Sequence, residues 1–352
     1  MRDVILFFIL AAGLADAYAG MGRVLAELRR KELIRTRSTS LLGDLLELVD
    51  GVLTAAGQEI KEILEGTASA LADSTTYKAP GDKDSDECKA DTCCIWSYIA
   101  SDMVPTFTDG AQCSALARGA IRLGFHDAGA WNSSMSFGGA DGSILLSGEL
   151  TRPENNGLSA IAEQATSWFN GYKTYGITMA DLIQIGSLVA TVTCPGGPRI
   201  RAFVGRKDNN TPPPQGLMPS PFQDAPALVE LFEAKTFTAN DLVALVGAHS
   251  VSQQFFVDTS KAGAPQDTTD GVWDVKFYSE TSSSETPDGV FKFPSDVSLS
   301  QDSTTSTAWR TFAASESSWA AAYAPAYFRM SLLGVSNLND LTDCTKILPL
   351  PR

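Results

Sequence analysis

The chain has only two histidines, and each follows a run of apolar residues with helical spacing. His126 stands in the stretch AIRLGFHDAG, four residues after Arg122, so a helix would place the imidazole and the guanidinium on one face. His249 stands in LVALVGAHSV, on the same predicted stripe as Leu242 and Leu245. Taken singly, each histidine is predicted to be a hydrogen-bonded core residue; only the pair indicates catalysis.

These residue types exclude two common kinds of hydrolase and favour peroxide chemistry. A catalytic zinc site needs three protein ligands, so two histidines would need a carboxylate as the third. The H-E-x-x-H signature of zinc proteases and the G-x-S-x-G signature of serine hydrolases are both absent. One histidine as the axial ligand of a haem iron, and the other as an acid and base beside an arginine, would suffice to activate hydrogen peroxide. The arginine would stabilise the charge that separates as the O–O bond breaks.

Helical elements must position both histidines. The stretches TMADLIQIGSLVATV and TANDLVALVGAHSV each open on a threonine followed three residues later by an aspartate, which resembles a capping box with Asp in place of Glu. Strand signals are few and short, and long loops rich in Pro, Gly, Ser and Thr separate the helical runs. We therefore predict one mainly α-helical domain with extensive ordered loops.

The stretches RLGFHDA and LVGAHSV resemble the distal and proximal motifs of the plant-type haem peroxidase superfamily, in particular its secreted fungal class, class II. The resemblance covers roughly residues 88–352. It implies a mainly α fold with few short strands, in which haem b is held between a distal and a proximal helical half. It also implies that His249 ligates the iron, with Arg122, Phe125 and His126 on the distal side.

Two further stretches resemble the segments that orient the histidines in this family. ELTRPENNGL is similar to the distal relay, in which Asn155 would accept a hydrogen bond from the distal histidine and Glu149 would fix the asparagine; the adjacent Asn156 leaves the position open. FPSDVSLSQD is similar to the proximal segment and would place Asp296 on the second nitrogen of His249. Taken alone, Asp296 would be an ordinary loop acid.

The resemblance also implies two calcium sites, because oxygen-only ligand sets suit a hard cation. The distal set would comprise Asp127, the carbonyl of Gly139, Asp141 and Ser143. The proximal set would comprise Ser250, Asp267, Thr269, the carbonyl of Val272, and Asp274.

The six cysteines allow many pairings, and only the resemblance selects one. Family pairing would join Cys88 to Cys94, Cys93 to Cys344, and Cys113 to Cys194.

In the fungal class that the chain resembles, certain positions set the substrate class, and the corresponding positions here hold other residues. Ala115, Gly119 and Phe255 stand where manganese ligands would be, and Ala244 stands where an exposed redox tryptophan would be. We expect a generic enzyme that oxidises phenolic or similar small donors with H2O2 by one-electron steps at the haem edge. Alternatives are a lignin-peroxidase-like enzyme that uses another tryptophan, such as Trp131, or a non-catalytic calcium- and haem-binding scaffold.

The ends of the chain and its charge predict location and partners. Residues 1–19 resemble a signal peptide, and residues 20–86 a helical prosegment or N-terminal extension plus a polar linker; the peroxidase domain would span 87–352. The formal net charge of −14 disfavours nucleic acid as a partner. We expect a secreted, extracellular monomer with no stable membrane anchor, and Asn132 and Asn209 as glycosylation acceptors.

Overall fold

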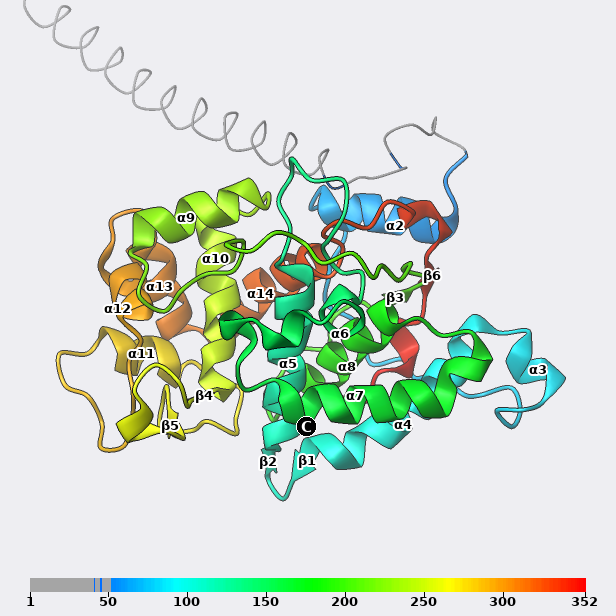
Figure 1. The fold of residues 1–352 in the computed structure, drawn as a ribbon, viewed down its shortest axis with the longest axis horizontal. Helices are drawn as coiled ribbons and strands as arrows, with labels where there is room; N and C mark the ends of the chain where they lie inside the picture. The colour runs from blue at the N-terminus through cyan, green and yellow to red at the C-terminus, as the bar shows by residue number, and fades with distance from the viewer. Residues whose placement is uncertain (1–40, 42–44, 46–51) are drawn as a thin grey trace, which may run out of the picture.

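The structure is a computed structural model that describes residues 41, 45 and 52–352. The predicted signal peptide and most of the predicted helical segment that follows it lie outside the described residues. Helices dominate the fold, and Figure 1 shows them gathered into two groups that lie side by side. The mainly α architecture predicted from the sequence is confirmed.

The first group of helices contains α4 (Thr92–Phe107), α5 (Ala115–Ala128), α7 (Ser159–Tyr172) and α8 (Met179–Thr193). The second contains α9 (Ala225–Ala234), α10 (Ala239–Val246), α11 (Lys276–Ser282), α12 (Pro294–Gln301), α13 (Ser306–Ala314) and α14 (Glu316–Met330). Among the described residues, the remaining α-helices are α2 (Ala55–Leu64) and two single turns, α3 (Asp86–Lys89) and α6 (Ser143–Leu146).

Strands make up little of the described residues, and each has only two residues. They pair antiparallel as β1 (Thr108–Asp109) with β2 (Gln112–Cys113), β3 (Phe203–Val204) with β6 (Thr342–Asp343), and β4 (Gln253–Gln254) with β5 (Ala264–Pro265). Pairs this short do not form a core. They fix the ends of loops that return to the helical groups.

Glycines let the helices that carry the histidines pack closely. A Cβ on Gly124 of α5 would lie 2.6 Å from Cβ of Ser187 in α8 and 2.7 Å from the Tyr327 hydroxyl in α14. A Cβ on Gly247, two residues before His249, would overlap Tyr278 and Trp319. The glycines in both histidine motifs therefore serve close packing.

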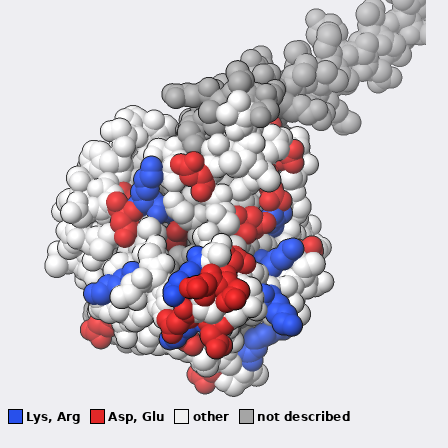
Figure 2. Space-filling model, turned by 90° about the vertical axis from the view of Figure 1, so that its right-hand side faces the viewer, with Lys and Arg blue, Asp and Glu red and all other residues white. Residues whose placement is uncertain are grey.

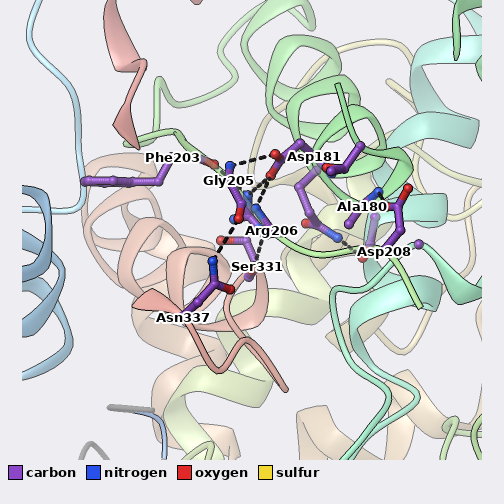
Figure 3. A network of polar contacts seen from close by, with 12 residues as sticks. Ala180, Asp181, Phe203, Gly205, Arg206, Asp208, Ser331 and Asn337 are labelled. Atoms are coloured by element: carbon purple, nitrogen blue, oxygen red, sulfur yellow. Dashed lines mark hydrogen bonds and ion pairs between the residues drawn. The ribbon is translucent and has the colours of Figure 1, made fainter. Parts of the chain in front are cut away.

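The two predicted capping boxes differ. At α10, Thr238 and Asp241 bond each other's backbone amides, so the box is complete. At α8, Thr178 accepts from the amide of Asp181, but the Asp181 carboxylate turns instead to Arg206 at 2.9 Å and to the amide of Gly205 at 2.6 Å. Figure 3 shows the Arg206 guanidinium held between Asp181 and the carbonyl of Ser331. The prediction of a second full box is therefore wrong, because a buried ion pair takes the carboxylate.

Residues 54–86 pack against the domain that follows them. Glu59 of α2 pairs with Arg201 at 2.5 Å, and Thr54 bonds Asn339. Further along, Leu71 forms a β-bridge with Ile200, and the amide of Tyr77 donates to the carbonyl of Lys346 at 2.8 Å. The segment predicted to be a polar linker is therefore fastened to the domain along its length.

Three disulfides close the fold and leave no free cysteine among the described residues. They join Cys88 to Cys94, Cys93 to Cys344, and Cys113 to Cys194, the pairing that the resemblance implies. Cys93–Cys344 connects the start of α4 to the carboxyl-terminal segment across 251 residues. Closing a loop of this length restricts the unfolded chain strongly.

No helix in the described part of the chain is long and apolar enough to cross a bilayer. Figure 2 shows acidic side chains gathered on the face that lies toward α3.

Candidate active site

A cavity of about 970 Å³ lies between α5 and α10, and both histidines line it. In Figure 1 these two helices run alongside each other at the centre of the molecule. The cavity wall is mainly apolar, and its volume lies in the upper part of the range of roughly 300–1,000 Å³ that is typical for cofactor pockets. Its apolar side chains include Leu228, Phe232, Leu242, Leu245, Val246, Leu299 and Met330.

His126 is 9% exposed and faces this cavity from the last turn of α5. Its Nδ1 lies 2.7 Å from Oδ1 of Asn155, and Nε of Arg122 donates to its Nε2 at 3.2 Å. Nε2 therefore accepts, and Nδ1 carries the proton that it donates to Asn155. Burial, and then the charge of Arg122, lower the pKa of His126 to about 3. The ring is a neutral base at physiological pH.

Asn155 is held in the orientation that this tautomer needs. Its Nδ2 donates to the backbone carbonyl of Glu149 at 2.9 Å, which leaves Oδ1 to face His126. The Glu149 carboxylate itself binds Arg152 at 3.2 Å and Ser147 at 3.0 Å. Glu149 thus fixes the asparagine through its main-chain carbonyl, whereas its carboxylate binds Arg152 and Ser147.

Arg122 is fixed by main-chain oxygens that the sequence did not reveal. Nη1 donates to the carbonyl of Asn156 at 2.7 Å, and Nη2 donates to that of Glu154 at 2.9 Å. The two adjacent asparagines therefore have different partners: Asn155 bonds the histidine and Asn156 bonds the arginine. Burial lowers the pKa of Arg122 to about 10, so it remains a cation at neutral pH.

His249 lies in a 3₁₀ turn, Gly247–Val251, that continues α10. Its Nδ1 donates to Oδ2 of Asp296 at 2.9 Å, where Asp296 is buried near the start of α12. The rings of Phe277 and Phe293 flank it edge-on at 5.6 and 5.5 Å. With Nδ1 bonded to the carboxylate, Nε2 is the nitrogen left for a metal. These residues fit haem iron, because a carboxylate behind the ligand makes the imidazole a stronger donor.

The proposed distal calcium ligands lie together where the end of α5 meets the loop before α6 and the start of α6. The Asp127 carboxylate accepts from the amides of Gly142 at 3.1 Å and Ile144 at 3.4 Å. Asp141 accepts from the amide of Ser143 and, at 3.2 Å, from the side chain of Asn209. Burial, and then the charge of Asp141, raise the pKa of Asp127. Because all these donors are neutral, a cation fits the cluster.

The backbone conformation and close packing of the distal loop require a glycine at position 139. It has a φ of 98° and lies so close to Leu333 that a Cβ would overlap the carbonyl of that residue. This position leaves room only for main chain.

The proposed proximal calcium ligands lie after His249 and around the turn that precedes α11. Ser250 Oγ and Asp267 Oδ2 are buried without any hydrogen-bond partner. Burial is also the main cause that raises the pKa of Asp267 to about 7. Thr269 Oγ1 donates to Asp274 at 2.9 Å, and its carbonyl accepts from the amide of Val272. Two orphaned buried oxygens beside two carboxylates fit a hard cation.

In the described residues, no three or more His, Cys, Asp and Glu side chains are grouped as metal ligands. Each calcium set has two carboxylates, and the rest of its ligands are hydroxyl and carbonyl oxygens. Sequence reasoning missed the Asn209 contact and the two carbonyls that hold Arg122. Main-chain oxygens have no side-chain signature, so no sequence signal could have identified them.

A mainly helical fold with two histidines across one apolar cavity, one backed by an asparagine and the other by an aspartate, defines a haem peroxidase. The sequence model of the family described as "Peroxidase" matches residues 99–315, and the chain belongs to that family.

Similar proteins include the peroxidase of Arthromyces ramosus, 30% identical over 280 residues that cover 73% of this chain and 76% of the relative. Ligninase LG5 of Phanerodontia chrysosporium is 31% identical, and the alignment covers 75% of this chain and 76% of the ligninase. Versatile peroxidase VPS1 of Pleurotus eryngii is 29% identical, and the alignment covers 74% of this chain and 76% of the versatile peroxidase. The resemblance to fungal class II peroxidases is confirmed, and the family implies haem, H2O2 and a reducing substrate.

Proposed function

We propose that this haem peroxidase oxidises phenolic or similar small organic donors by successive one-electron steps at the haem edge, without a manganese site or a surface redox tryptophan. The observation that carries the proposal is the pairing of a neutral His126 with the Arg122 cation at 3.2 Å, in the same cavity as His249. A base and a cation that lie side by side at one cavity can act on the same small molecule.

The roles follow from the hydrogen bonds. Bound haem supplies the iron at which peroxide is reduced. His126 accepts a proton from peroxide at Nε2 and returns it to the departing oxygen, since Asn155 keeps the other proton on Nδ1. Arg122 stabilises the charge that develops during this step. His249 would hold the iron, and its hydrogen bond to Asp296 keeps the ring oriented.

Two calcium ions would stabilise the site from either side. The distal set begins at Asp127, next to His126, and the proximal set begins at Ser250, next to His249. Each ion would thus fix the residue that follows a histidine. The buried orphan oxygens of Ser250 and Asp267 support this assignment.

The donor class is inferred from what surrounds the cavity. Ala115, Gly119 and Phe255 line it where manganese ligands would be needed, and none of them has a carboxylate. All six tryptophans of the chain are buried, Trp131 included. These features favour oxidation at the haem edge over oxidation through a tryptophan. The complete set of catalytic side chains argues against the scaffold alternative.

We also propose that the protein is secreted and monomeric. The signal-like residues 1–19 and the three disulfides support export to an oxidising compartment.

A stopped-flow experiment tests the proposed function. The haem-loaded protein is mixed with H2O2 while the Soret band is followed, and then with guaiacol, veratryl alcohol or Mn²⁺. We expect a rapid Soret change and fast turnover of guaiacol alone. Equal turnover of veratryl alcohol or Mn²⁺ would contradict the donor assignment, and an unchanged Soret band would contradict catalysis.

A further inference from the structure

Asn209 is bonded to the proposed distal calcium ligand Asp141 through both its side chain and its main chain. Its Nδ2 donates to Oδ2 of Asp141 at 3.2 Å, and its backbone amide donates to the carbonyl of Asp141 at 2.9 Å. Its Oδ1 accepts from the amide of Thr211 at 3.0 Å. A backbone amide can only donate and an ionised carboxylate can only accept, so these two partners fix the orientation of the Asn209 side chain.

The Asp141 carboxylate is held from two separate parts of the chain. Its Oδ1 accepts from the amide of Ser143 at 3.1 Å, within the same loop, whereas Asn209 reaches Oδ2 from a loop 68 residues further along. After accepting one hydrogen bond, each oxygen still has a lone pair for a cation. Donors of this kind orient a ligating carboxylate and strengthen metal binding.

The loop that carries Asn209 is itself fixed on both sides of that residue. Before it, Asp208 accepts from two amides at the start of α8 at 3.0 and 2.9 Å, and Figure 3 shows Asp208 beside one of them, Ala180. After it, the carbonyl of Pro213 accepts from Arg152 at 2.7 Å. A donor that is mounted on a fixed loop can hold its acceptor in one position.

A small cavity of about 150 Å³ lies beside Asn209 and Asp141. Its other polar side chains include those of Lys207, Asp208 and Asn337. One water molecule occupies about 30 Å³ in the liquid, so the cavity has room for several. It therefore offers a cation a route to Asp141, and Asn209 lines that route.

Asn209 and Asn132 both lie in N-x-S/T triplets, but their side chains are used differently. Oδ1 of Asn132 accepts from the amide of Ser134 at 3.0 Å and from its hydroxyl at 2.6 Å. Within the part of the chain that the structure describes, Nδ2 of Asn132 makes no hydrogen bond. An N-linked glycan is attached at Nδ2. That atom is therefore free at Asn132, whereas at Asn209 it is bonded to Asp141.

We propose that Asn209 is a positioning residue of the distal calcium site and not a glycan acceptor, and that its side-chain amide holds the Asp141 carboxylate in place for the cation. The inference rests on the proposed function, because the calcium site belongs to that proposal. Asn209 acts on the cation only through Asp141. Its removal should therefore weaken calcium binding more than it weakens the calcium-free fold.

A calcium titration tests this role without turnover. The haem-loaded secreted protein is depleted of calcium and titrated in competition with a chromophoric chelator, as wild type, Asn209→Ala and Asp141→Asn. We expect the binding step that Asp141→Asn abolishes to weaken about 10- to 100-fold in Asn209→Ala. Unchanged affinity in Asn209→Ala would overturn this proposal alone. A wild type that binds no calcium would overturn the calcium sites as well.

Stability with and without calcium separates positioning from ordinary packing. Wild type and Asn209→Ala are unfolded with urea, once in calcium and once in EGTA. We expect the variant to lose more stability in calcium than in EGTA, because only the calcium-bound protein gains from tight binding. An equal loss in both conditions would show that Asn209 merely supports its loop, and would overturn the proposal.

Two neighbouring residues provide matched controls. Asn210→Ala removes an exposed asparagine and keeps the triplet, whereas Thr211→Val destroys the triplet and keeps the Asn209 side chain with its backbone donor. Both variants should bind calcium as the wild type does. Weakened binding in Thr211→Val, restricted to protein from a glycosylating host, would assign the effect to a glycan and overturn the proposal.

Peptide mass spectrometry tests the glycan directly. In protein from a glycosylating host, we expect a glycan on the peptide that contains Asn132 and none on the peptide that contains Asn209. A glycan on Asn209 in the calcium-bound protein would overturn the proposal.

Discussion

The position of one proton determines what His126 can do. Because Asn155 accepts from Nδ1 and Arg122 donates to Nε2, the proton of the neutral ring is on Nδ1 and its one lone pair is on Nε2. Had the asparagine been turned around, its NH₂ group would face Nδ1 and favour the opposite tautomer. The bond from Asn155 to the carbonyl of Glu149 prevents that rotation.

On the proximal side, replacing Asp296 by asparagine should weaken the enzyme without removing haem. The neutral amide no longer draws the proton on Nδ1 of His249, so the imidazole donates less electron density. We expect the rate with H2O2 to fall about 10- to 100-fold and the Fe(III)/Fe(II) potential to rise. Spectroelectrochemistry measures the potential, and an unchanged potential would contradict the role given to Asp296.

The sequence could predict the residues with chemically distinctive side chains. Helical spacing predicted Arg122 and His126 on one face, the pair of histidines indicated peroxide chemistry, and the resemblance supplied Asn155 and Asp296. The sequence could not predict how Glu149 acts, because the contact is made by its carbonyl. Main-chain contacts depend on the path of a loop, which side-chain identity alone does not determine.

At the scale of elements, the start of α8 is held from two directions. Asp208 accepts from the amides of Met179 at 3.0 Å and Ala180 at 2.9 Å, while Asp181 faces Arg206 (Figure 3). Arg206 belongs to the loop after β3, far along the chain, so local sequence could not show that Asp181 would leave its capping role. Short-range patterns predict helices well but miss long-range partners of this kind.

Replacing Arg206 by methionine should strongly destabilise the fold. Arg206 and Asp181 are both buried, so the substitution leaves a carboxylate without its cation. We expect a loss of about 3–5 kcal/mol in the free energy of unfolding, measured by urea denaturation. Lys89→Met removes a solvent-exposed pair and should cause no measurable change. Equal effects of the two variants would show that burial of the pair is not what matters.

Calcium removal should loosen the turn beside His249. Without a cation, the partnerless oxygens of Ser250 and Asp267 remain buried at an energetic cost. At a calcium concentration of about 100 times Kd, we expect calcium to add about 3 kcal/mol of stability. Thermal unfolding with EGTA, and then with calcium or magnesium restored, measures this effect. A melting temperature insensitive to EGTA would argue against both calcium sites.

At the scale of the whole molecule, the cavity lies where two helical groups meet, and several contacts join distant segments. Cys93–Cys344 connects α4 to the carboxyl-terminal segment, and residues 54–86 run along the domain. Lys235, fully buried after α9, donates to the carbonyl of Trp131 after α5 at 2.8 Å. The sequence indicated the mainly helical class, but contacts between distant segments needed the structure.

Lys235 predicts a pH dependence of stability. Burial lowers its pKa from 10.5 to about 8, so between these values the folded protein has released a proton that the unfolded chain still holds. Stability should therefore rise as pH increases through this window, and the cost of burying the charge is fully present below about pH 8. Urea denaturation of Lys235→Met and wild type across this range should give curves that converge at high pH. Parallel curves would contradict the lowered pKa.

We propose that His126 and His249, which line one cavity, act on one haem, where His126 would be the base and His249 would hold the iron. The most direct measurement compares the Soret response to H2O2 in haem-loaded wild type and His126→Ala. We predict that the variant keeps its haem and the resting spectrum of a histidine-ligated iron, while its rate with H2O2 falls about 10²- to 10⁴-fold. A variant that loses haem, or that reacts at the wild-type rate, would contradict this assignment.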